Sequence, residues 1–268
     1  MSIIDRIKSF KLESNQFAIF WLGQNSYIIK ITPRTSIAID PYLSRDKEHR
    51  YVHSKPPVEP EDLKVDYIFC THDHGDHTDP TALPIIAKNY LETIFLGPRE
   101  SCEHLADLGI NRDRLIALEV NRPYVTEDFT ATAYYSILPE KADTTHFGYL
   151  FQIKNSKIYN MGDSDREIAK EPEVLLNPIK EASPDIAIVP IIGDVKGRIP
   201  EDVYIVTKFI KPKIVIPCHY DCFADRTIDP KEFVRLLKRN PDIKPVVIPY
   251  KGFYMYGGSV KSSVAGLD

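Results

Sequence analysis

Apolar residues along the chain gather in short runs bounded by Gly, Pro, Asn and Asp, and such runs predict buried strands. Other segments carry apolar residues three and four positions apart, a spacing that predicts amphipathic helices. The predicted strands cover residues 18–22, 26–31, 36–39, 66–70, 93–96, 116–118, 129–135, 149–153, 157–160, 186–192, 214–218 and 246–249. The predicted helices cover residues 3–10, 80–89, 98–108, 200–209 and 230–239.

The order of these elements indicates an α/β fold. The first three strands are separated by tight turns such as Gly23-Gln24-Asn25, so we expect an antiparallel meander there. Farther on, strands alternate with helices in both halves of the chain, which predicts two sheets with helices on the outside. We expect residues 1–268 to form one domain with two internal αβ halves, because α/β folds of this length are often single domains.

Composition and charge narrow the class of protein. The 268 residues are 43% hydrophobic and 27% charged, as in an ordinary globular protein, and their formal net charge is −4. This acidic balance gives no electrostatic reason to expect nucleic acid as a partner. The N-terminus lacks a signal-peptide core, and no stretch approaches the roughly 18–20 apolar residues of a membrane span. We therefore expect a cytoplasmic protein that does not bind membranes. The four cysteines form no paired framework and are expected to be reduced.

The segment Thr71–His77, Thr-His-Asp-His-Gly-Asp-His, directly follows the predicted strand 66–70. It places His72, His74, Asp76 and His77 within six residues. Neutral imidazoles and carboxylates are natural ligands of zinc, manganese and iron. A loop at a strand end could direct His72 and His74 to one ion, and Asp76 and His77 to a neighbouring ion. The alternative, a solvated polar loop, does not account for four such side chains together.

One loop does not complete two coordination spheres, so we expect further ligands at later strand ends. Asp163, in Met-Gly-Asp-Ser, follows a predicted strand and could bridge two cations; the alternative is an Asp in a turn. His219, in Ile-Pro-Cys-His-Tyr-Asp, also ends a predicted strand; the alternative is a buried histidine with a structural role. Both become stronger candidates beside the first segment.

The remaining ligand is His104 or His146, the two histidines between His77 and Asp163. His146 is favoured, because it lies close to a strand start whereas His104 lies within a predicted helix. Asp40 ends the strand 36–39 and is a candidate acceptor that would orient a ligand histidine; the alternative is a helix or turn cap. The loop at 42–60 holds two further histidines and is either a flap or ordinary surface.

These motifs resemble those of a known family. Thr-His-Asp-His-Gly-Asp-His resembles the signature of the metallo-β-lactamase superfamily, Met-Gly-Asp-Ser its bridging-Asp motif, and Ile-Pro-Cys-His-Tyr-Asp its last His motif. Within the superfamily, residues 17–23, 94–99 and 213–221 are similar to the L-ascorbate-6-phosphate lactonase-like group. The resemblance implies a metallo-β-lactamase-type αβ/βα four-layer sandwich with metals at the sheet edge.

The resemblance also implies roles for the candidate residues. It assigns His72, His74 and His146 to a first metal, Asp76, His77 and His219 to a second, and Asp163 to both. The chain departs from the pattern at one point: many relatives carry the third histidine of the first metal near the position of Tyr135 and Ser136 here. This departure leaves the third ligand of the first metal open.

The expected activity is hydrolysis by a metal-bound hydroxide, hydrogen-bonded to Asp76, that attacks an ester-like carbonyl. By the resemblance, the small-molecule substrate is a phosphorylated lactone such as L-ascorbate 6-phosphate. The cofactor is one or two divalent ions, zinc or manganese, with iron also compatible. Lys196 and Arg198 could bind the substrate phosphate, although a solvated charged turn explains them equally well. The relatives also suggest a homo-oligomer.

Three other functions remain open. A phosphodiesterase or nuclease of the same fold would normally bring an inserted domain or a basic face, and this chain is net acidic. A flavodiiron-type redox protein would normally carry a Glu at the position of His74 and a flavin domain. A metal-binding module without activity would not need so full a ligand set. A metal-dependent hydrolase is therefore the main prediction.

Overall fold

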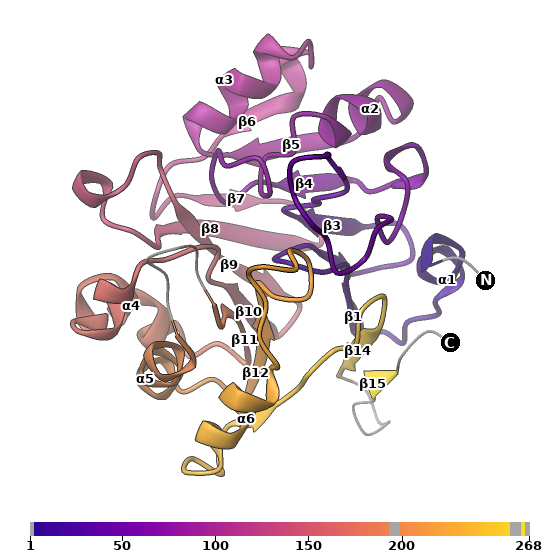
Figure 1. The fold of residues 1–268 in the computed structure, drawn as a ribbon. Coiled ribbons are helices and arrows are strands. Elements are labelled where there is room, and N and C mark those ends of the chain that lie inside the picture. The colour runs from indigo at the N-terminus through magenta and orange to yellow at the C-terminus, as the bar shows by residue number, and fades with distance from the viewer. Residues whose placement is uncertain (1–2, 193–198, 258–263, 266–268) are drawn as a thin grey trace. The chain divides into compact units, whose positions relative to one another are not determined.

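The computed structural model describes residues 3–192, 199–257 and 264–265, and for the last two the backbone alone. The chain forms two compact units: unit 1 comprises Met1–Ala117 and Ile248–Asp268, and unit 2 comprises Leu118–Val247. Each unit contains one mixed sheet and three α-helices within the described residues (Figure 1). Two mixed sheets with helices confirm the α/β fold that the sequence pattern predicts, and they fit the metallo-β-lactamase-type sandwich that the resemblance implies. The single-domain expectation stays a prediction.

Unit 1 contains an eight-stranded sheet in the order β15-β14-β1-β2-β3-β4-β5-β6. Its first three strands form the predicted antiparallel meander, and β3 to β6 run parallel to one another. Parallel strands end at the same edge of a sheet, so the loops after β3 and β4 are neighbours. The strands are β1 (Phe17–Trp21), β2 (Tyr27–Lys30), β3 (Ser36–Ile39), β4 (Tyr67–Phe69), β5 (Ile94–Gly97), β6 (Leu115–Ala117), β14 (Phe253–Tyr256) and β15 (Val264–Ala265).

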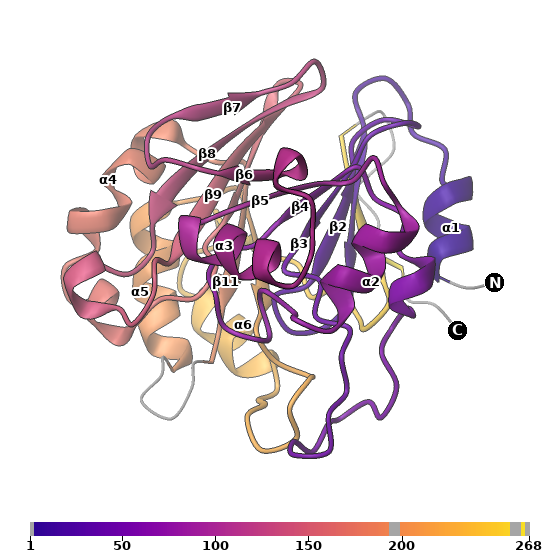
Figure 2. The same ribbon diagram turned by 90° about the horizontal axis from the view of Figure 1, so that it is seen from above.

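Three helices cover one face of this sheet (Figure 2). They are α1 (Ile3–Ser9), α2 (Ala82–Asn89) and α3 (Arg99–Asp107). Their apolar faces share one buried cluster with strand residues such as Ile28, Ile68 and Phe95. Burial of apolar surface contributes about 25 cal/mol per Å², so this cluster is a main source of stability for unit 1.

Unit 2 contains a seven-stranded sheet in the order β13-β12-β11-β10-β9-β8-β7. The strands β7 to β10 are antiparallel, whereas β10 to β13 are parallel. The strands are β7 (Pro123–Val125), β8 (Phe129–Tyr135), β9 (Phe147–Ile153), β10 (Ser156–Asn160), β11 (Ile186–Pro190), β12 (Ile214–Cys218) and β13 (Lys244–Pro245). Helix α5 (Pro200–Ile210) contacts β11 and both other helices, α4 (Pro172–Ala182) and α6 (Lys231–Leu237).

The predicted strand at 246–249 is wrong. The strand found in its place, β13, covers only Lys244 and Pro245, and the N–H of Val246 makes one more bond to the carbonyl of Val215. From Ile248 the chain belongs to unit 1, so the apolar run at 246–249 joins the units instead of extending the sheet.

Five of the six α-helices in the described residues lie where the sequence predicts them, and α4 is the exception. All four cysteines are buried, and none of them forms a disulfide. Burial raises the pKa of the Cys102 thiol to about 11, so it stays protonated near neutral pH. Among the described residues, no helix combines the length and the apolar character needed to cross a membrane.

Candidate metal centre

The His-rich segment forms a compact loop directly after β4. The loop closes on itself, because the N–H groups of His77 and Thr78 both donate to the carbonyl of His74, at 2.9 and 2.7 Å. Two imidazoles converge in it, with 3.0 Å between His72 Nε2 and His74 Nδ1. The side chains of His72 and His77 also offer ligand nitrogens within 4.8 Å of each other. A strand-end loop thus gathers several nitrogen donors in one small volume.

Asp40 is the centre of a buried hydrogen-bond network beneath this loop. It follows β3 with a left-handed backbone, φ 42°, and is fully buried. Its Oδ2 lies 2.6 Å from His77 Nδ1, and it accepts hydrogen bonds from the Asn25 amide and from the Thr71 backbone and hydroxyl, each at 2.7 Å. Because a carboxylate accepts hydrogen bonds, His77 donates its Nδ1–H to Asp40, and Nε2 is then the ring nitrogen that could bind a metal.

Asp76 is held by a residue that the sequence pattern did not single out. Gln24 donates its amide N–H to Asp76 Oδ2 at 2.9 Å, and the same oxygen lies 3.5 Å from His77 Nε2. Gln24 sits in the turn between β1 and β2, with φ 50° and only 2% exposure. The signal that could have identified it is the occurrence of two amides, Gln24 and Asn25, in a turn flanked by apolar strands.

His104, the less favoured candidate for the remaining metal ligand, contacts the same loop through Asp73. It lies in α3 as predicted, and its Nδ1 is 2.9 Å from Asp73 Oδ1. Asp73 stands between His72 and His74, so this contact ties the loop to the helix. Thr78 adds a second tie: its hydroxyl donates to the carbonyl of His72 within the loop at 2.7 Å, and the same oxygen lies 3.0 Å from the Ser101 hydroxyl oxygen in α3.

Unit 2 brings Asp163 and His219 together. The two residues follow the parallel strands β10 and β12, and His219 Nε2 lies 3.1 Å from Asp163 Oδ1. Both turns use left-handed backbone, with φ 65° at His219 and 61° at Gly162. The Ser136 hydroxyl, directly after β8, donates to the carbonyl of Asp163 and so fixes the turn that follows β10.

His146 lies at the edge of the unit 2 sheet where strand β8 ends. It precedes β9, is 3% exposed, and its carbonyl accepts the N–H of Ser136 at 3.1 Å. Its Nε2 is 3.4 Å from Asp143 Oδ1. Since Tyr135 pairs with Phe147 across the β8–β9 ladder, His146 lies next to the strand end at Tyr135 and Ser136, where the resemblance leads us to expect the third histidine.

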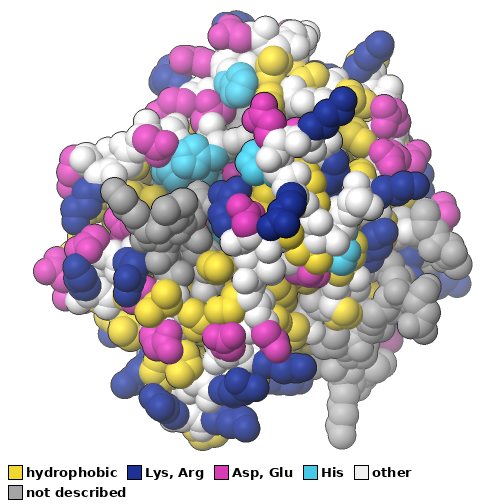
Figure 3. Space-filling view, in the orientation of Figure 1, with side chains coloured by type: hydrophobic (Ala, Val, Ile, Leu, Met, Phe, Trp, Pro, Cys, Tyr) yellow, Lys and Arg dark blue, Asp and Glu magenta, His cyan; other side chains and the backbone are white. Residues whose placement is uncertain are grey.

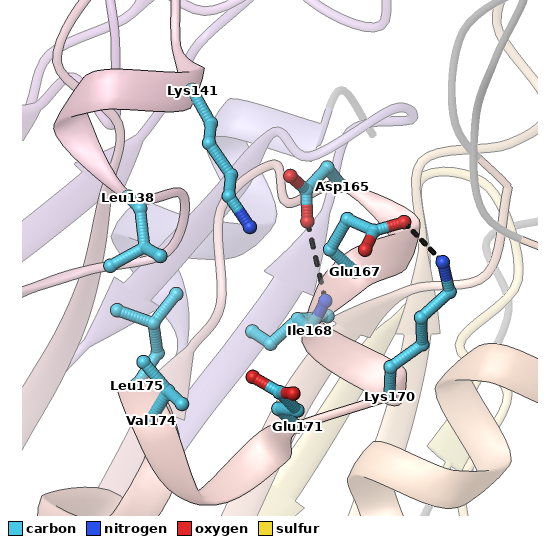
Figure 4. A pocket seen from close by; sticks show the side chains of 9 residues that line it. All are labelled: Leu138, Lys141, Asp165, Glu167, Ile168, Lys170, Glu171, Val174 and Leu175. Atoms are coloured by element: carbon cyan, nitrogen blue, oxygen red, sulfur yellow. Dashed lines mark hydrogen bonds and ion pairs between the residues drawn. The ribbon is translucent and has the colours of Figure 1, made fainter.

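A cavity of about 180 Å³ lies in unit 2. Its lining includes Asp165, which follows Asp163 by two residues in the sequence. It is bounded by the turn η3 (Pro139–Lys141), the turn η4 (Arg166–Ala169) and the start of α4. Figure 4 shows Lys141 directed into the cavity, opposite the carboxylates of Asp165 and Glu171, with Leu138 and Leu175 on an apolar side. The cations predicted from the sequence, Lys196 and Arg198, lie outside the described residues.

Within each unit the donor set fits a divalent transition metal. Unit 1 offers imidazoles and the Asp76 carboxylate, and unit 2 offers Asp163 beside His219. Such N and O ligands suit zinc, manganese or iron. The side chain of Asp76 is 21% exposed and His74 is partly exposed, and Figure 3 shows histidine side chains at the surface among interspersed acidic and basic ones. An ion in solvent can therefore reach such donors.

Comparison with known proteins identifies the family. A family model described as a beta-lactamase superfamily domain matches residues 18–219, a range that contains all seven candidate ligands. A UPF0173 metal-dependent hydrolase of Bacillus thuringiensis is 30% identical over 226 residues, which are 79% of this chain and 89% of the relative. Another, from Hyperthermus butylicus, is 30% identical over 246 residues, or 88% and 98% of the two chains.

Solved structures show the same fold. The metallo hydrolase Igni18 from Ignicoccus hospitalis superposes with a TM-score of 0.68 at 20% identity, over 91% of this chain and all of that one. An isothiocyanate hydrolase from Delia radicum gut bacteria gives a TM-score of 0.69 at 17% identity, over 88% and 97% of the two chains. The chain belongs to the beta-lactamase superfamily, and within it to the UPF0173 metal-dependent hydrolases.

Proposed function

We propose that this metal-dependent hydrolase opens a phosphorylated lactone, with L-ascorbate 6-phosphate as the model substrate. The main observation that supports a hydrolytic site is the contact between Asp40 and His77. It orients His77 within the loop that also holds the other candidate imidazole and carboxylate ligands of unit 1. The lactone is supported by the similarity of residues 17–23, 94–99 and 213–221 to the lactonase-like group. The names of the relatives give the reaction class and leave the substrate to be tested.

We further propose that the candidate ligands of both units serve one metal centre. His72, His74 and His146 would bind a first ion, Asp76, His77 and His219 a second, and Asp163 both. The ions would be zinc or manganese, with iron also compatible. A divalent cation held by these groups would lower the pKa of a bound water and polarise the carbonyl under attack.

Asp76 is the proposed catalytic group of the protein itself. Its Oδ2 accepts the Gln24 amide proton, and this hydrogen bond fixes the direction of the carboxylate. The carboxylate would accept a hydrogen bond from the attacking water and so orient it toward the carbonyl. Gln24 is a positioning residue in this scheme, because it acts only through Asp76.

The cavity lined by Asp165, two residues after Asp163 in the chain, is the proposed binding region for the part of the substrate away from the carbonyl. Leu138 and Leu175 would contact the carbon skeleton, and Lys141, Asp165 and Glu171 would bind its hydroxyl groups (Figure 4). The lining holds three carboxylates against two lysines, so Lys196 and Arg198 remain the proposed phosphate contacts. A small-molecule substrate suits a cavity of about 180 Å³.

The test is a turnover screen on the purified chain after metal analysis. The substrates would be a phosphorylated lactone, its unphosphorylated form, a phosphodiester reporter and an isothiocyanate, each with zinc, manganese or iron restored. We expect turnover of the phosphorylated lactone in preference to the others. Turnover of the phosphodiester alone would overturn the lactonase proposal and favour a phosphodiesterase.

The variant Asp163→Ala tests the proposed centre in the same screen. It should lose both metal and turnover while its circular dichroism spectrum stays that of the parent. The exposed Asp225→Ala is the matched control in the same unit and should keep both. Retained turnover in Asp163→Ala would remove Asp163 from the proposed centre.

A further inference from the structure

A second cavity, of about 410 Å³, lies in unit 1 at the end of the sheet opposite to the His-rich loop. Ser36, at the start of β3, and Asp66, just before β4, line it, whereas Asp40 and Thr71 follow the other ends of these two parallel strands. We call this cavity the basic cleft. Its other polar and charged lining residues are Lys8, Lys30, Thr32, Arg34, Thr35 and Lys64.

The basic cleft has an excess of positive charge. Four cations line it, Lys8, Lys30, Arg34 and Lys64, against the single carboxylate of Asp66. Asp66 Oδ2 already accepts two hydrogen bonds from Ser36, from its N–H at 2.7 Å and its hydroxyl at 2.9 Å. A chain with a net charge of −4 therefore concentrates positive charge here, which favours an anionic ligand.

Lys30 makes the basic cleft a built site and not only an exposed basic surface. The residue is 5% exposed, and its ammonium donates to the carbonyls of Ile7 and Lys8 at the end of α1, at 2.5 and 3.3 Å. An ammonium has three N–H donors, so one remains beyond these two. Burial lowers the Lys30 pKa, with Asp66 opposing that shift. A bound anion would offset the cost of this buried charge.

Thr32 supplies a neutral donor beside these cations. Its hydroxyl oxygen accepts the N–H groups of Arg34 and Thr35, at 3.2 and 2.9 Å. With its oxygen engaged as an acceptor, the hydroxyl proton is left to donate. Ammonium, guanidinium and hydroxyl donors around one volume match the several acceptor oxygens of a phosphate group.

We propose that the basic cleft binds a small organic phosphate, at a site separate from the proposed metal centre. Lys30 and Thr32 would donate to the phosphate oxygens, and Lys8, Arg34 and Lys64 would balance the charge. The volume of about 410 Å³ exceeds that of a phosphate ion and leaves room for an organic part. Neither the family assignment nor the proposed hydrolysis requires this site.

The experiment is a calorimetric titration of the full chain with glucose 6-phosphate, and with glucose as the neutral probe. We expect saturable binding of glucose 6-phosphate, weakening as salt rises from low to physiological concentration, and no binding of glucose. Asp163→Ala should bind as the parent does, which separates this site from the metal centre. Equal binding of glucose, or loss of binding in Asp163→Ala, would overturn the proposal.

Paired variants locate the site. Arg34→Ala with Lys64→Ala removes two exposed cations of the basic cleft and should weaken binding about tenfold. Lys88→Ala with Arg112→Ala removes two exposed cations elsewhere in unit 1 and should leave binding unchanged. Equal affinities in the two double variants would contradict the assignment, and so would an absence of saturable binding in the parent.

Discussion

Asp40 and His219 adopt left-handed backbone conformations, with φ of 42° and 65°. This region costs energy for most residues other than glycine, although Asp, Asn and His tolerate it better than others. Each residue stands directly after a parallel strand, where the chain must turn sharply to present a side chain at the sheet edge. The sequence identified both as candidates from their strand-end positions, but it gave no sign of the backbone geometry that directs them.

Asp40→Asn is predicted to lower metal affinity by about 10- to 100-fold, as the loss of an acceptor behind a ligand histidine typically does. The amide cannot stabilise the Nδ1–H of His77 as a carboxylate does. Asp79→Asn is the matched control, because Asp79 is also fully buried and accepts backbone N–H groups from Leu43, Ser44 and Ala82. Chelator competition would measure affinity, and equal losses in both variants would argue against a specific role for Asp40.

Cys102 predicts a dependence of stability on alkaline pH. Burial raises its pKa from 9.0 to about 11. A raised pKa in the folded state means that its contribution to stability is complete below pH 9 and is lost as pH rises toward 11. Between pH 8 and 10 the parent should lose about 1 kcal/mol more of its free energy of unfolding than Cys102→Ala. Urea titrations at both pH values would measure this, and identical losses would contradict it.

At the scale of elements, the apolar pattern predicted most strands and helices to within a few residues. The meander β1–β2–β3 and the β9–β10 hairpin depend on contacts that are local in sequence, so short-range patterns capture them. The order of strand and polar loop also placed the His-rich segment correctly after β4. That was the most informative part of the sequence for the candidate site.

The elements that were missed have identifiable physical reasons. Helix α4 contains Pro178, and an internal proline normally argues against a helix. Strand β7 is a short edge strand that begins with Pro123 and is largely exposed, so it lacks an apolar run. Strand β14 is an apolar run between Gly252 and Gly257, so the local pattern does carry a strand signal there, and only its pairing with the distant β1 is not readable from it. The contact between Gln24 and Asp76 was missed because it joins residues 52 positions apart.

Gly148 in β9 is predicted to tolerate no side chain. A Cβ there would lie 2.7 Å from the Tyr159 hydroxyl oxygen, and Tyr159 is fully buried. Gly148→Ala should therefore cost about 1–3 kcal/mol of unfolding free energy through overpacking. Gly75→Ala is the control, because nothing lies within 4 Å of its Cβ position and its backbone is not left-handed. It should change stability by less than about 0.5 kcal/mol and keep its metal. Urea unfolding would distinguish the two, and equal costs would refute the packing argument.

At the scale of the molecule, the candidate ligands divide between the two compact units. Four belong to the loop after β4 in unit 1, and His146, Asp163 and His219 belong to unit 2. Within each unit the topology brings donors to one sheet edge, because parallel strands end together. We propose that both sets of ligands bind one metal centre. The sequence supports this part of the proposal only through the family resemblance, and a measurement of metal affinity in variants can test it directly.

A double-mutant cycle between the units supplies that test. If His72 and Asp163 bind the same ion, the His72→Ala variant already binds metal weakly. The further loss of affinity caused by Asp163→Ala is then smaller in that variant than in the parent. The double variant His72→Ala/Asp163→Ala should then lose less metal affinity than the sum of the single losses, with a coupling above about 0.5 kcal/mol. Independent sites would give additive losses, as His72→Ala with Asp225→Ala should. Thermal unfolding gives a second readout: saturating metal should raise the Tm of the parent, since a ligand that binds only the folded state stabilises it, and should raise that of the double variant far less. Additive losses together with an undiminished rise in Tm would mean that the two units do not share a metal.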